Sequence, residues 1–295
     1  MKIQDLLKRF KKCEEIKKGW SQDKKYFVIQ NEKKYFLRIG ELSRREKLEF
    51  LFLTSKKLEV LGIPTPASIE FGVCEDGVYL IQSFTSGKDF REKITFLTKS
   101  EQYNFGVKAG EILKKIHSLP APEEQENWAT FFNNKINIKI KKYLEYGLRF
   151  DGDERFISYI EQNRRLLNDR PQCFQHGDYH IGNMTLEEQK LLVIDFDRFS
   201  FGDAWEDFRP IVWSAEKSAF FASGQLHGYF NGEPTEEFFK TLALYLALNS
   251  LVSVYWALPF GSSEVETMLK QAKEVLNWFD NMQNHIPVWY QKTFS

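Results

Sequence analysis

The sequence is short of cysteine, has no excess of either charge and begins without an apolar leader. Its three cysteines are odd in number and lack the spacing of metal ligands, so we expect free thiols in a reducing cytosol at Cys13, Cys74 and Cys173. Lys and Arg number 41, as do Asp and Glu, so the overall charge does not indicate a nucleic-acid partner. Residues 1–5 contain no signal-peptide core. These absences favour a soluble, cytoplasmic globular protein, long enough for one large domain or two.

Charge and hydrophobicity are unevenly distributed. Residues 1–60 hold 17 Lys and Arg against 9 Asp and Glu, which leaves 24 basic and 32 acidic residues for the remainder. A basic first part suits an anionic nucleotide, although solvated faces also explain such charges, and an aromatic and basic RNA motif is lacking. The uncharged run 241–263 is long enough to cross a bilayer. Asn249, Ser250 and Ser253 interrupt it, so we predict a buried core helix and no membrane insertion.

One polar motif carries the residue types that phosphoryl transfer needs. His176-Gly177-Asp178 has Asn183 five residues after the aspartate, and a predicted strand then leads to Ile194-Asp195-Phe196-Asp197. Asp178 can accept a proton from a substrate hydroxyl, and Asn183 and Asp195 can hold the metal that bridges nucleotide phosphates. Protein kinases use the same spacing, with an Arg where Gly177 stands here. A chance polar loop beside a hydrophobic strand is the alternative.

These segments resemble the aminoglycoside phosphotransferase and choline kinase group of small-molecule kinases. The resemblance covers nearly the whole chain but is specific only near residues 19–46 and 176–207. It implies an α+β, bilobal protein kinase-like fold, with an N-terminal five-stranded antiparallel sheet, one main helix and a larger, mostly helical C-terminal lobe. We expect the nucleotide-binding lobe at residues 1–85, a hinge at about 82–87, and the catalytic and acceptor-binding lobe at 86–295.

The resemblance also implies two contacts to the nucleotide in the first lobe. Residues 19–26 would form a lid over the phosphates, in which the Ser21 hydroxyl or amide donates to a phosphate oxygen. A plain hairpin turn would explain this segment equally well. The backbone from Gln82 to Phe84 would bind adenine.

A third expected contact comes from the strand before the main helix. Arg38 stands where the family carries a phosphate-binding lysine, and Glu46 stands where it carries the glutamate that pairs with this lysine. We therefore predict an Arg38–Glu46 ion pair. The alternatives are an ordinary edge arginine and a capping box between Ser43 and Glu46.

Hydrophobic periodicity and turn residues predict the remaining elements. Strands are expected at 14–19, 24–30, 34–39, 67–73, 78–84 and 191–194, and helices at 3–10, 42–60, 98–117, 128–147, 153–168, 204–222, 235–258 and 262–283. In the 204–222 region, Asp207 is expected to brace the catalytic loop and Asp203 to cap the helix.

The expected activity is Mg²⁺-dependent transfer of the γ-phosphate of ATP or GTP to a hydroxyl of a small molecule. An aminoglycoside-like amino sugar is the first acceptor suggested by the resemblance, with choline, homoserine, a sugar or a macrolide as alternatives. Glu206 or Glu216 would then receive a cation, on which Trp213, Tyr255 and Trp256 would pack, although a helical core also explains these rings. A nucleotide-binding pseudokinase scaffold is the competing class of function. The sequence does not indicate an oligomeric state.

Overall fold

The computed structural model describes residues 1–17 and 23–292 and divides the chain into two compact units. The first comprises Met1–Phe90 and Asn183–Asp197, and the second comprises Arg91–Gly182 and Arg198–Ser295. The return of residues 183–197 to the first unit was not anticipated, because the predicted second lobe included them.

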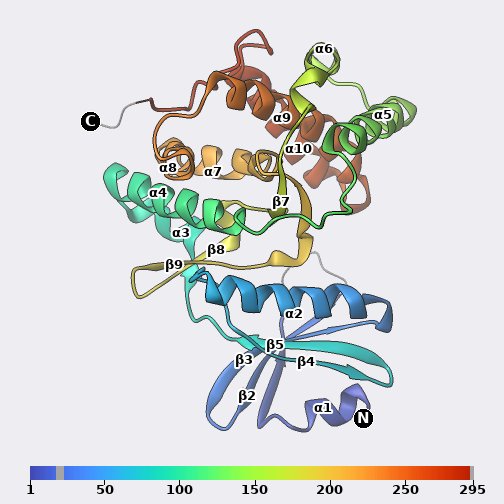
Figure 1. Ribbon diagram of the computed structural model, residues 1–295, viewed down its shortest axis with the longest axis vertical. Helices are drawn as coiled ribbons and strands as arrows, with labels where there is room; N and C mark the ends of the chain where they lie inside the picture. The colour runs from blue at the N-terminus through green and yellow to red at the C-terminus, as the bar shows by residue number, and fades with distance from the viewer. Residues whose placement is uncertain (18–22, 293–295) are drawn as a thin grey trace. The chain divides into compact units, whose positions relative to one another are not determined.

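The first unit is built on a five-stranded antiparallel sheet in the order β1-β2-β3-β5-β4 (Figure 1). Its strands are β1 (Lys12–Glu15), β2 (Lys24–Gln30), β3 (Lys33–Gly40), β4 (Ser68–Cys74) and β5 (Gly77–Ser83). Alternate residues such as Val28, Leu37 and Ile81 are buried in one hydrophobic cluster, as the period of a half-buried strand requires. The short helix α1 (Ile3–Leu7) adds Leu6 to this cluster. The main helix α2 (Arg45–Val60), preceded by the 3₁₀ turn Leu42–Arg44, packs on β4 and β5.

A smaller sheet also belongs to the first unit. It contains β6 (Lys88–Asp89), β8 (Met184–Glu187) and β9 (Lys190–Val193), all antiparallel. Because β8 and β9 form a hairpin, the residues that flank it are neighbours, and the Ile194 amide donates to the Asn183 carbonyl at 3.0 Å.

Helices make up most of the second unit. They are α3 (Phe90–Lys93, which begins at the unit boundary), α4 (Lys99–Ile116), α5 (Trp128–Tyr146), α6 (Asp153–Asn163), α7 (Ile211–Lys217), α8 (Ala219–Phe230), α9 (Glu236–Trp256) and α10 (Ser262–Trp278), with a two-stranded sheet of β7 (Gln172–Gln175) and β10 (Ser200–Asp203). The predicted capping box at the start of α4 is present, since Thr98 accepts from the Glu101 amide and Glu101 accepts from the Thr98 amide. Helix α9 is long and apolar enough to cross a membrane, but 78% of its apolar window is buried inside the protein, as expected for a core helix.

The single helix predicted at 204–222 is wrong. The structure has a 3₁₀ turn at Glu206–Phe208 and then the separate helices α7 and α8. Pro210 lacks the amide proton that a continuing helix would need and stands immediately before α7. Ser218 is extended, with φ −158°, and its side chain caps α8 by accepting from the Phe221 amide.

Helices α4 and α8 approach each other through glycine. A Cβ atom at Gly106 or Gly110 would overlap backbone atoms of α8, and one at Gly224 or Gly228 would overlap backbone atoms of α4. The two helices therefore pack backbone to backbone.

Candidate functional site

The predicted catalytic aspartate lies in the second unit, on the loop that follows β7. The side chain of Asp178 is 24% exposed. Its two carboxylate oxygens face Arg198 Nη1 at 3.5 Å and His180 Nε2 at 3.7 Å. The carboxylate is thus oriented by neighbours while it remains open to solvent.

Gly177 shows why this loop departs from the protein-kinase sequence. Its φ is +82°, a conformation that glycine adopts without strain. A Cβ atom here would also overlap the carbonyl oxygen of Arg198. No larger residue, arginine included, fits this position without moving the backbone.

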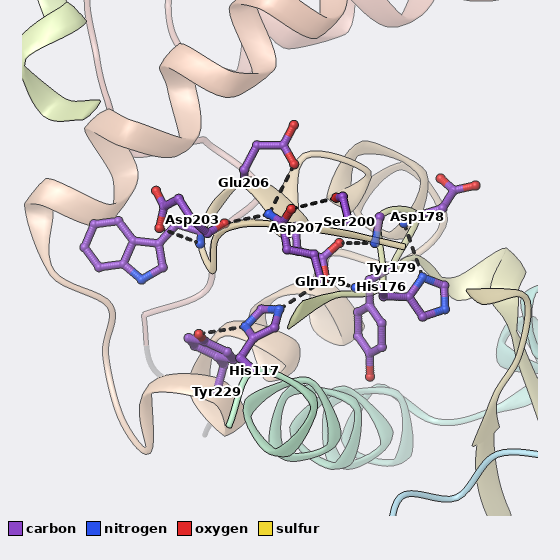
Figure 2. A network of polar contacts seen from close by, with 12 residues as sticks. His117, Gln175, His176, Asp178, Tyr179, Ser200, Asp203, Glu206, Asp207 and Tyr229 are labelled. Atoms are coloured by element: carbon purple, nitrogen blue, oxygen red, sulfur yellow. Dashed lines mark hydrogen bonds and ion pairs between the residues drawn. The ribbon is translucent and has the colours of Figure 1, made fainter. Parts of the chain in front are cut away.

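Asp207 braces the loop, as predicted (Figure 2). Its carboxylate is completely buried and accepts hydrogen bonds from the amides of His176 and Gly177, both at 2.7 Å, and from His117 Nε2 at 3.1 Å. Burial alone would raise the pKa of this carboxyl group, but the His117 hydrogen bond and the Gly177 amide outweigh it and hold the pKa below its ordinary value. Arg209 adds a further tie, donating to the Gly177 carbonyl at 3.1 Å.

Two histidines of the loop use the same backbone contact. Each Nδ1 accepts the amide of the residue two positions later, His176 from Asp178 at 3.2 Å and His180 from Gly182 at 3.0 Å. Burial lowers the pKa of His180 to about 4, against the opposing effect of the Asp178 carboxylate. A neutral His180 that accepts at Nδ1 carries its proton on Nε2, the atom that faces Asp178.

Asp203 does more than the predicted capping. It accepts the Trp205 amide at 3.1 Å, but it also receives Arg170 at 3.0 and 3.1 Å and the Tyr245 hydroxyl at 2.6 Å. The Gln175 side chain donates to the Asp203 carbonyl at 2.7 Å, so this buried residue ties β7 to α9.

Arg38 lies in the first unit at the centre of a group of acids. Its guanidinium approaches Asp197 at 2.6 Å, Asp195 at 3.5 Å and Asp23 at 3.8 Å. Arg44 joins Asp197 at 2.8 Å and Asp23 at 3.0 Å. We call these five residues the Arg–Asp cluster. Burial would raise the pKa of Asp197, but the charges of Arg38 and Arg44 hold it below the ordinary value.

The predicted Arg38–Glu46 ion pair is wrong for this structure. Glu46 is exposed, and across residues 1–17 and 23–292 it forms no ion pair. Arg38 instead forms ion pairs with aspartates, two of which, Asp195 and Asp197, follow strand β9. The capping box with Ser43 is also not formed, because α2 begins two residues after Ser43 and has no side-chain cap.

Asn183 and Asp195 flank the β8–β9 hairpin, which brings these two predicted metal ligands to the same end of it. Asp195 has φ +64°, and its side chain is 42% exposed. A carboxylate and an amide offer the oxygen ligands that Mg²⁺ prefers, so the pair fits this ion. In the described part of the chain no group of three or more His, Cys, Asp or Glu could hold a metal.

The remaining residues that were predicted to contact the nucleotide are Ser21, Gln82 and Phe84. Ser21 lies outside the described residues. Gln82 is in β5, where its side chain donates to Ser68 at 3.4 Å. The Phe84 amide donates to the Lys34 carbonyl at 3.3 Å and would have to leave it to bind adenine.

Sequence reasoning missed Asp23, Arg44 and Arg209. Arg44 pairs with Asp197, 153 positions away, and Arg209 donates to the Gly177 carbonyl, 32 positions away, so the local sequence does not indicate these contacts.

The comparisons with known proteins concern the family and the fold of the chain. A model of the phosphotransferase enzyme family matches residues 12–239. No curated relative matches the sequence. Similar solved structures include the gentamicin complex of APH(2'')-IIa, with a TM-score of 0.64, 18% identity and coverage of 92% of this chain and 95% of that chain. A choline/ethanolamine kinase family protein from Mesorhizobium loti has a TM-score of 0.67, 15% identity and coverage of 97% and 98%.

A third similar structure is a thermostable mutant of aminoglycoside phosphotransferase APH(4)-Ia in complex with ADP and hygromycin B. Its TM-score is 0.66, with 14% identity and coverage of 93% of this chain and 96% of that chain. At these identities the likeness concerns the fold, and it confirms the predicted α+β, kinase-like class.

Proposed function

Because this chain belongs to the phosphotransferase enzyme family, we propose that it transfers the γ-phosphoryl group of a nucleoside triphosphate to a hydroxyl of a small molecule. The observation that carries the proposal is the state of Asp178, a partly exposed carboxylate on a loop whose backbone is fixed by the buried Asp207. A loop held this firmly positions a proton acceptor in advance of the reaction.

The proposed reaction places the chemistry on Asp178. The acceptor oxygen bonds to the γ-phosphorus while its proton passes to the Asp178 carboxylate, and the bond from this phosphorus to its bridging oxygen breaks to release the nucleoside diphosphate. His180 and Arg198 face the two carboxylate oxygens and keep them oriented toward the acceptor.

The nucleotide is proposed to bind through the first lobe, residues 1–85, with a hinge at 82–87 and an acceptor-binding lobe at 86–295. Arg38 and Ser21 would contact phosphate oxygens, and the backbone at Gln82 and Phe84 would bind adenine. ADP is present in the solved APH(4)-Ia structure, which supports ATP, with GTP as the alternative.

Asn183 and Asp195 are the proposed ligands of Mg²⁺. When bound, this ion neutralises charge on the transferred phosphate. The exposed carboxylate of Asp195 and the oxygen character of both side chains support the assignment.

The acceptor is proposed from the solved structures and from the resemblance of the motifs. Gentamicin and hygromycin B in the solved complexes support an amino sugar, and the choline/ethanolamine kinase family protein supports a small amino alcohol. Homoserine, a neutral sugar and a macrolide remain alternatives. The cytoplasmic location stays a prediction.

A nucleotide-consumption assay against hydroxyl-bearing amines, amino acids, sugars, sugar acids and antibiotics tests this function, with mass spectrometry of the product. Asp178→Asn should retain nucleotide binding and lose about 10²–10⁴-fold in turnover, because the proton acceptor is gone. The matched variant Asp195→Ala should instead lose Mg²⁺-dependent nucleotide binding. Full transfer by Asp178→Asn would contradict the assignment. Nucleotide binding without transfer to any compound would favour the pseudokinase scaffold.

A further inference from the structure

A row of lysines on α5 faces the uncharged part of helix α9, from Thr241 onward. Lys135, Lys139 and Lys142 are spaced by four and three residues and therefore share one face of α5. That face packs against α9, because Lys139 and Lys142 place their ammonium groups 5.9 and 5.7 Å from the centre of the Tyr255 ring. Helix α9 carries no charged residue from Thr241 to its end, so it supplies no carboxylate to this row.

The row connects to the catalytic loop through one glutamate. Lys135 contacts Glu206 at 3.4 Å, and Glu206 contacts Arg209 at 3.3 Å. Arg209 in turn donates to the carbonyl of Gly177, the residue before Asp178, and to Asn249 of α9 at 3.2 Å. We call Lys135, Lys139, Lys142 and Arg209 the basic patch.

The patch has more positive charge than its surroundings neutralise. Glu206 is the carboxylate shared by Lys135 and Arg209, so four cations meet one anion. Among residues 1–17 and 23–292, neither Lys139 nor Lys142 has an ion-pair partner. Desolvation of its ammonium group and the charges of Lys142 and Lys135 lower the pKa of Lys139, which is the effect of a crowded and uncompensated row.

The same residues disfavour a cationic acceptor. The Tyr255 ring stacks on Tyr146 at 5.4 Å, and Lys142 also lies 5.9 Å from the Tyr146 ring centre. Of the three rings expected to receive a cation, Tyr255 is therefore already covered by the protein's own ammonium groups. Glu206, one of the two acids expected to bind that cation, is buried and paired twice.

A second observation points to a missing polar ligand. Tyr255 is 7% exposed, and its hydroxyl is a buried group without a hydrogen-bond partner among the residues that the structure describes. An unpaired buried hydroxyl is costly, and a ligand oxygen is one partner that would satisfy it.

We infer that the acceptor is an anionic alcohol, a polyhydroxy compound that places its hydroxyl at Asp178 and a carboxylate or phosphate group on Lys139 and Lys142. Asn249, which contacts Arg209, and Tyr255, which contacts Lys139 and Lys142, are six residues apart on α9, or about 9 Å along its axis. A sugar acid and a sugar phosphate are the simplest acceptors of this class. The inference rests on the proposed function and selects a substrate class within it, in place of the amino sugar.

Four hexoses that differ mainly in charge test the inference: glucose, glucosamine, glucuronate and glucose 6-phosphate. With the full-length enzyme, kcat/KM should be at least about tenfold higher for one anionic hexose than for glucose, and lowest for glucosamine. Added salt should reduce the preference, because the ammonium groups are partly exposed. Comparison of glucuronate with glucose 6-phosphate shows whether the lysines bind a carboxylate or a phosphate group.

The variant Lys139→Gln/Lys142→Gln should lose this preference through a rise in KM of about tenfold, with kcat and the KM for nucleotide unchanged and glucose unaffected. Lys141→Gln is the matched control, since Lys141 is on the same helix but pairs with Glu145 at 3.8 Å. An unchanged KM for anionic hexoses in the double variant, or a preference for glucosamine, overturns the inference and leaves the proposed function intact.

If no hexose accepts phosphate, the inference can be tested by binding. The four hexoses are then titrated calorimetrically into nucleotide-saturated protein. Tighter binding of the anionic members that the double variant abolishes supports the inference, and equal binding to both proteins overturns it. Absence of Asp178-dependent transfer to every compound of the wider panel counts against the proposed function instead.

Discussion

Aspartates hold loops at two places in this protein, in the Arg–Asp cluster and at the single buried Asp207, and they do so by different means. In the first unit the Arg–Asp cluster joins three carboxylates to two guanidinium groups, all of them side chains, and Asp195 is 42% exposed. In the second unit Asp207 is fully buried and is held by two backbone amides and His117. Side-chain partners can be exchanged when a ligand arrives, whereas backbone donors are fixed by the fold. The cluster is therefore suited to receive a nucleotide, and Asp207 to keep Asp178 in place.

The largest expected effect comes from Asp207→Asn. The amide has one acceptor oxygen for three donors, and its own N–H groups would face N–H groups. We expect a loss of about 3 kcal/mol in the free energy of unfolding, typical of a buried charged acceptor that is removed from its donors. Urea denaturation measures this loss. A cost below about 1 kcal/mol would show that the backbone amides find other partners.

An intermediate effect is expected from pH. The pKa of His180 is about 4 in the folded protein, against an ordinary value of 6.5, so between these limits the unfolded chain binds more protons. Stability should therefore fall as the pH drops from 6.5 to 4, by up to about 3 kcal/mol. Burial also lowers the pKa of His227, so the difference between wild type and His180→Gln isolates the share of His180.

His180→Gln should make the plot of unfolding free energy against pH less steep between pH 4 and 6.5. The lowered pKa values of Asp207 and Asp197 act only below about 3.8, the ordinary pKa of an aspartate, so the two acid transitions are separable. Parallel curves for the wild type and this variant between pH 4 and 6.5 would contradict the assignment.

The smallest effect is expected from Asp197→Asn. Arg38 would keep Asp195 and Asp23, and Arg44 would keep Asp23, so two carboxylates would remain for two guanidinium groups. We expect a loss of about 1 kcal/mol or less in urea denaturation. A loss as large as that of Asp207→Asn would remove the distinction between the exchangeable cluster and the fixed brace.

Local signals predicted much of the fold. Alternating apolar residues marked β2 and β3, and the Thr98 capping box marked the start of α4. The roles that the motif spacing assigns to Asp178, Asn183 and Asp195 stay a prediction. The helix predicted at 204–222 failed because Pro210 and Ser218 act as local breakers inside an otherwise helical pattern.

The partners of charged side chains were not predictable, because they are chosen by the tertiary fold. Arg38 and Asp195 are 157 positions apart, and nothing in the sequence near Arg38 favours Asp195 or Asp197 over Glu46. Nothing in the sequence near the lysines of α5 indicates that Tyr255 and the uncharged part of α9 are their neighbours.

The glycine contact between α4 and α8 has a consequence for the catalytic loop, since the Tyr179 hydroxyl donates to the carbonyl of Ala109 in α4 at 2.6 Å. Alanine normally improves a helix, but in this interface a single added methyl group would push two backbones apart. Any such separation would be transmitted to the residue next to Asp178. Four glycines thereby set the tolerance within which Asp178, the proposed proton acceptor, is held.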